Sequence, residues 1–93
     1  MYMEDVEHAL EAAALRICGT NNDAKALPLL MASLDLTGAM VEVVEGLNGA
    51  GRSIEVTPAL GADAVTRIQA AQTSKALLSI IADLTAKANA FHP

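Results

Sequence analysis

The feature that most constrains this chain is the C-terminal stretch of residues 57–91, which has no proline after Pro58 and no glycine after Gly61. Glycine and proline are the residues that most often interrupt helices, so the stretch predicts one long helix. Thr57 followed by Pro58 suits its start, because a threonine side chain caps a free backbone N–H. Proline fits the first helical position, because the N–H that it lacks would have no partner within the helix there. Asp63 is a second candidate cap.

Two further helices are predicted upstream, where apolar residues recur at three- and four-residue steps. The first spans residues 3–18 and ends at Gly19. The second spans residues 26–47 and is apolar over more than half of its circumference, so we expect it to be central and covered on more than one side. Gly38 within it costs about 1 kcal/mol against alanine, which is tolerable if a neighbouring helix comes close there.

The fold class predicted for residues 1–93 is therefore a single all-α domain, either a helical hairpin or a three-helix bundle. Its helices lie near residues 3–18, 26–47 and 58–90. Composition agrees, because apolar residues make up 53% of the chain but aromatic residues only 2%. Alanine and leucine, which favour close helix packing, supply the excess.

A β-hairpin is the alternative for the middle of the chain, with residues 40–45 and 52–56 as its two arms. Both arms have β-branched residues at alternate positions, which is typical of strands. Short apolar runs of this kind fit a helix or a strand.

The same periodicity predicts the core and an interface between copies. We expect the core to contain Leu34, Val41, Ile68, Leu78, Ile81 and Leu84. A helix of about 34 residues is roughly 51 Å long and one of about 22 residues roughly 33 Å, so the second helix cannot cover the last one, and a homodimer is expected to complete the fold. The candidate interface residues are Leu77, Ile81, Leu84, Phe91, Leu36, Met40 and Val43.

Charge excludes some partners. The chain has 11 acidic and 6 basic residues, a net charge of -5, and its acidic residues concentrate in the first half. Without a basic stripe, nucleic-acid binding is not expected. The most apolar window, residues 26–44, contains Asp35 and Glu42, so a membrane span is not expected either. An acidic N-terminus unlike a signal peptide and a lone Cys18 favour the cytoplasm.

The sequence contains only weak matches to motifs for nucleotide binding, metal binding or catalysis. Residues 46–53 match a phosphate-binding loop except for Arg52 at the lysine position, but the residues that follow cannot open a helix, so no nucleotide is expected. His8 lies among Glu4, Glu7 and Glu11, a cluster more typical of a surface histidine than of a metal site. We expect no metal, cofactor or catalytic residue, and not an enzyme.

Two function classes fit a chain of this kind, whose order of elements occurs in many unrelated small bacterial and phage proteins. The first is a non-catalytic protein–protein interaction module, such as an adaptor, regulator or partner-specific chaperone, acting as a homo-oligomer through an apolar helix face with an acidic margin. The alternative is a self-assembling structural subunit of a larger particle or secretion apparatus. A small enzyme or a phosphotransfer protein using His8 is a distant third.

Overall fold

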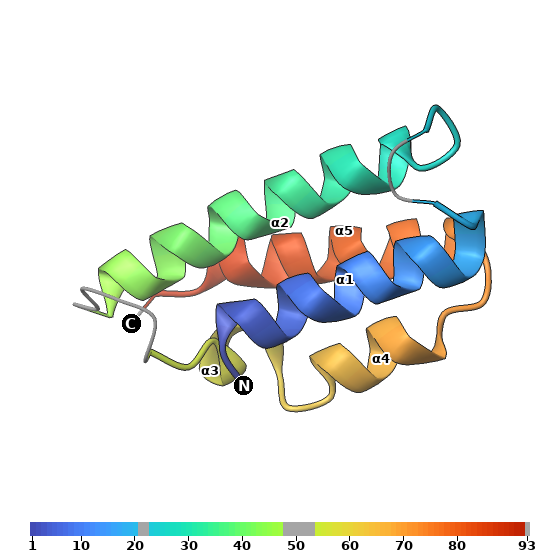
Figure 1. The fold of residues 1–93 in the computed structure, drawn as a ribbon. Helices are drawn as coiled ribbons and strands as arrows, with labels where there is room; N and C mark the ends of the chain where they lie inside the picture. Colours follow the sequence, from blue (N-terminus) through green and yellow to red (C-terminus); the bar gives the residue numbers. More distant parts are fainter. Residues whose placement is uncertain (21–22, 48–53, 93) are drawn as a thin grey trace.

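The computed structural model describes residues 1–20, 23–47 and 54–92, which form an elongated body of 37 × 21 × 18 Å (Figure 1). Its helices are α1 (Met3–Cys18), α2 (Leu27–Gly46), α3 (Thr57–Leu60), α4 (Ala64–Ala70) and α5 (Ser74–Ala90). No strand occurs in these ranges, so the all-α prediction is confirmed. Residues 40–45 belong to α2, and the β-hairpin alternative is therefore wrong; its other arm lies partly outside the described residues.

The first two helices lie where the sequence predicts them. The Asp5 carboxylate accepts a hydrogen bond from the Tyr2 N–H at 2.7 Å and so satisfies a free donor at the start of α1. Gly19 ends α1 at a φ of 76°, a left-handed conformation that glycine adopts without steric cost.

The prediction of one long C-terminal helix is wrong, because two breaks divide it into α3, α4 and α5. Gly61, at a φ of 91°, ends α3. Ala71 is extended, with a ψ of 131°, and ends α4 without a glycine or proline. The Thr73 hydroxyl then accepts a hydrogen bond from the Ala76 N–H at 3.1 Å and caps α5. The chain reverses between α4 and α5, and α4 lies on the opposite side of the body from α2 (Figure 1).

Two arginines form hydrogen bonds between helices near the second break. Arg16 of α1 donates hydrogen bonds to the carbonyl oxygens of Ile68 and Ala71 at 3.2 and 2.9 Å, at the end of α4 where carbonyl groups lack the usual helical donors. Arg67 of α4 donates to the Asp83 carboxylate of α5 at 2.7 Å. This hydrogen bond is the main reason that the pKa of Asp83 lies below its usual value.

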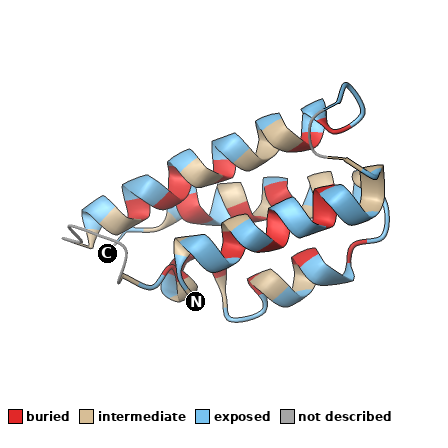
Figure 2. Cartoon of the chain, viewed as in Figure 1, coloured by how far each residue is buried: buried red, intermediate tan, exposed pale blue. Residues whose placement is uncertain are grey.

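Helix α5 is the central element, because it packs against each of the other four helices, most extensively against α2. Ile68, Ile81 and Leu84 are buried as predicted, and Leu78 is half-buried against the core. The prediction that Leu34 and Val41 belong to the core is wrong, because both are exposed. The prediction that α2 is central is wrong for the same reason: its inner side packs on α5 and α1, and its outer side is largely exposed (Figure 2).

Candidate protein interaction surface

One side of α2 exposes large apolar side chains in a row. Leu27, Met31, Leu34 and Val41 are 53%, 59%, 70% and 39% exposed. Their steps of three, four and seven residues place them on one stripe of the helix, opposite the buried Leu36 and Val43. We call the stripe formed by Leu27, Met31, Leu34, Gly38 and Val41 the outer α2 face. Isolated exposed hydrophobic residues are ordinary, but a contiguous row of them marks an interaction site.

Gly38 lies in the middle of this face. Apart from the backbone of α2 itself, a Cβ atom built on Gly38 meets no atom within 4 Å, so packing among the described residues does not require a glycine there. A glycine inside a helix is destabilising by about 0.5–1 kcal/mol relative to alanine. Among the described residues, no other helix comes close to Gly38, so the condition under which this glycine was expected to be tolerable is not met within them.

A groove of about 320 Å³ lies between α1 and the outer α2 face. Leu10, Leu30 and Leu34 provide its apolar part. Glu7 and Glu11, which lie one turn apart on α1, line the same groove. The groove therefore combines an apolar lining with two carboxylates.

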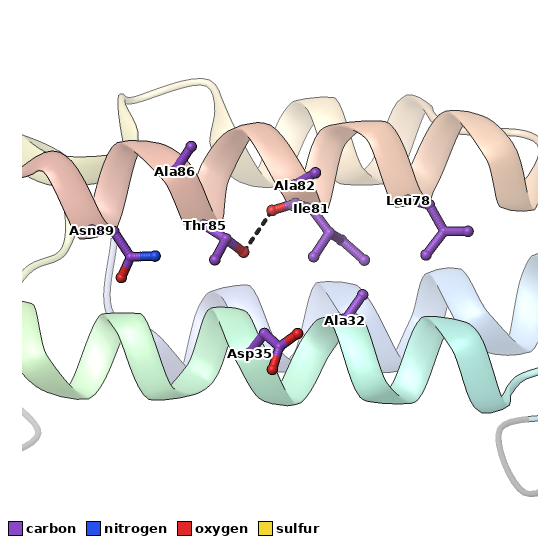
Figure 3. Close-up of a pocket in the computed structure, with 8 residues that line it drawn as sticks. All are labelled: Ala32, Asp35, Leu78, Ile81, Ala82, Thr85, Ala86 and Asn89. Atoms are coloured by element: carbon purple, nitrogen blue, oxygen red, sulfur yellow. Dashed lines mark hydrogen bonds between the residues drawn. The ribbon is translucent and has the colours of Figure 1, made fainter.

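A second groove, of about 440 Å³, lies between α2 and α5, on the other flank of α2 (Figure 3). Ala32 and Asp35 of α2 face Leu78, Ile81 and side chains of the following two turns of α5. The Asp35 carboxylate is exposed at this groove. Helix α2 is thus a ridge between two grooves that both contain carboxylates.

The charged side chains that line the two grooves beside the outer α2 face are all acidic. The residues that line the two grooves include Glu7, Glu11 and Asp35 but no lysine or arginine. Among the described side chains, ion pairs join Arg67 and Lys87 to Asp83 and do not involve these three carboxylates. The margins of the face are therefore acidic along both flanks of α2.

The residues predicted as interface candidates lie elsewhere. Leu36, Met40, Val43, Leu77, Ile81 and Leu84 are buried, and Phe91 is half-buried against them. They form the contact between α2 and α5 within one chain, because α5 has 17 residues and matches the 20 residues of α2. The length mismatch from which the homodimer was expected is absent. The sequence did contain the outer α2 face, as the second of two apolar stripes on one helix.

The weaker chemical candidates do not come together. His8 is exposed on α1, and the described residues contain no group of three or more metal-ligating side chains. The sulfur of Cys18 lies 3.9 Å from the Ser74 hydroxyl. Most of the glycine-rich loop, including Arg52, falls outside the described residues.

By length and composition, α2 also passes as a candidate membrane span, with a mean hydropathy of 1.6. A single helix of this kind is weak evidence of a membrane span, although only 28% of its most apolar window is buried within the chain. Asp35 and Glu42 on the exposed part of α2 oppose insertion, because a carboxylate within the hydrocarbon region is costly.

Comparison of the chain with models of protein families, with curated proteins and with solved structures finds no match. The structure defines an all-α protein whose second helix exposes an apolar face with acidic margins.

Proposed function

We propose that this protein is a non-catalytic protein–protein interaction module and that the outer α2 face is its docking surface. The observation that supports this proposal is the row formed by Leu27, Met31, Leu34 and Val41, which are exposed although the described residues form a separate buried apolar core. Exposed apolar rows of this kind, rimmed by polar residues, are typical of protein interaction sites.

A helix is the element that best fits this surface. The row from Leu27 to Val41 rises about 21 Å along α2, which a partner helix of about 15 residues matches. The two grooves beside α2 resemble the spaces into which one helix inserts its ridges when it packs on another. Recognition of an apolar helix face by a groove is a common mode of peptide binding.

A homo-oligomer and a self-assembling structural subunit remain alternatives that use the same face. Gly38 supports them in one respect, because the open space above it admits a closely approaching helix of any origin. The length mismatch that first indicated a dimer no longer supports them. Cytoplasmic location remains a prediction from the lone Cys18.

Photo-crosslinking at Leu34 tests the proposed function. Leu34 is replaced by the photo-reactive residue benzoylphenylalanine, the chain is expressed in its own host, and adducts formed on irradiation are identified by mass spectrometry. Gln69, exposed on α4, receives the same residue as a matched control. We expect protein adducts from position 34 and few from position 69. Lipid adducts alone at position 34, or equal adducts at both positions, contradict the proposal.

A further inference from the structure

We infer that the segment that docks on the outer α2 face is an amphipathic helix of a different protein, with lysine or arginine residues on both flanks of its apolar side. This inference rests on the proposed function and specifies the chemistry of the partner. Two independent observations support it: the exposed apolar row on α2, and the acidic margins along both flanks of that row.

The geometry places the opposite charges in reach. A helix with its side chains is about 10–12 Å wide, so a helix that lies along α2 holds its two flanks over the grooves beside α2. Glu7 and Glu11 line one groove and Asp35 the other. Lysine and arginine side chains pack their aliphatic stems on apolar surface while their charged ends reach such carboxylates. No described basic side chain competes for these three carboxylates by an ion pair.

A second copy of this chain fits the same surface less well. Helix α2 contains no lysine or arginine, so a copy placed on it presents acidic margins to acidic margins. Like charges juxtaposed across an interface oppose association. The same repulsion disfavours an anionic membrane surface. Lys25, just before α2, is the nearest described basic residue in the sequence and lies beyond the end of the apolar row.

Gly38 adds a steric feature to this surface. The absence of a Cβ atom leaves open space between Leu34 and Val41. A large apolar side chain of the partner helix is expected to occupy that space, next to Leu34. Binding therefore uses both the protruding leucine and the gap beside it.

The test uses two synthetic helical peptides of about 15 residues with leucine at identical positions on one side. In the basic peptide the flanking positions are lysine, and in the acidic peptide they are glutamate. Binding of each labelled peptide to the full chain is measured by fluorescence anisotropy at low and raised salt. We expect the basic peptide to bind, its affinity to fall as salt rises because screening weakens exposed charge pairs, and the acidic peptide to bind much more weakly.

Variants of the chain separate the apolar and charged contributions. Leu34→Gln is expected to weaken binding of the basic peptide by about 10-fold or more, because a leucine that the bound peptide covers is replaced by a polar side chain. Glu11→Gln and Asp35→Asn are each expected to weaken it by about 2- to 5-fold. Asp63→Asn, which removes the same charge beside α4, is the matched control and is expected to have no effect.

Each other result overturns the inference in a recognisable way. Equal binding of both peptides, still weakened by Leu34→Gln, means that the face accepts apolar helices regardless of charge, so the proposed function stands and the inference fails. Self-association that Leu34→Gln abolishes, with neither peptide bound, identifies a second copy as the occupant. Binding to phosphatidylcholine vesicles without binding to either peptide contradicts both the inference and the proposed function.

Discussion

The guanidinium of Arg16 lies 2.9 Å from the carbonyl oxygen of Ala71, 55 positions away in the chain. A second bond from the same nitrogen reaches the carbonyl oxygen of Ile68 at 3.2 Å. These bonds join the end of α1 to the point where α4 ends, and they satisfy acceptors that a continuous helix would have bonded internally. A residue from the other end of the sequence therefore donates hydrogen bonds at the break before α5.

Replacement of Arg16 by methionine is expected to lower the free energy of unfolding by about 1–3 kcal/mol, because two carbonyl acceptors lose a charged donor. Chemical denaturation with urea measures the change. Lys75→Met is a matched control, since Lys75 is exposed at the start of α5. Equal losses in the two variants would show that the Arg16 bonds add no specific stability.

The ion pair between Arg67 and Asp83 predicts a pH dependence of stability. The hydrogen bond from Arg67 lowers the pKa of Asp83 in the folded chain, with further lowering by the Lys87 charge. The contribution is therefore present above the usual aspartate pKa near 3.8 and is lost as pH falls through the lower folded value. Asp83→Asn is expected to be less stable than wild type at neutral pH and equal to it in strong acid, measured by urea unfolding. A difference that does not change with pH would contradict this assignment.

The orientation of α2 is tested by two leucines on opposite sides of the helix. Leu36 is fully buried, whereas Leu34 is 70% exposed. Leu36→Ala is expected to cost about 2–5 kcal/mol, as for other buried leucines, and Leu34→Ala less than about 0.5 kcal/mol. Urea unfolding at low protein concentration measures both. A larger loss for Leu34→Ala would mean that α2 is rotated or that the chain exists as an oligomer under those conditions.

Gly38→Ala is expected to stabilise the isolated chain by about 0.5–1 kcal/mol, because alanine favours the helix and its Cβ atom meets nothing within 4 Å. Thermal unfolding followed by circular dichroism measures the gain. A destabilised variant would indicate that the space above Gly38 is already occupied in the isolated chain.

Much of the fold was predictable from local patterns. Residues 3–18 and 26–47 show helical periodicity and clear ends, and the observed bounds of α1 and α2 agree within one residue. Alanine-rich composition with few aromatic residues correctly indicated an all-α fold for the described chain. The start of α4 directly after Asp63 also agrees with the second candidate cap, although the Asp63 side chain makes no capping bond there.

The division of the C-terminal stretch was harder to predict. No glycine or proline marks the break at Ala71, and the carbonyl group of Ala71 accepts a hydrogen bond from Arg16, which is distant in sequence. Thr73 does indicate a helix start, because threonine is a preferred N-cap residue. The apolar periodicity, however, continues across Thr73 and favoured one uninterrupted helix.

The candidate site was missed because α2 has two apolar stripes with the same spacing. The stripe through Leu36 and Val43 packs on the core, and the stripe through Leu34 and Val41 faces outward. Periodicity alone does not rank two such stripes. Which of the two stripes is buried depends on the length of α5, and the prediction of one long C-terminal helix gave the wrong length.

Backbone amide chemical shifts, recorded while the purified chain is titrated with the basic leucine–lysine peptide, test the central claim most directly. If the outer α2 face binds a basic amphipathic helix, the shift changes concentrate on Leu27, Met31, Leu34 and Val41 and on the groove at Glu11, and α4 remains unchanged. Changes centred on α4 or spread evenly over the chain, or none at peptide concentrations that saturate the anisotropy signal, would contradict it.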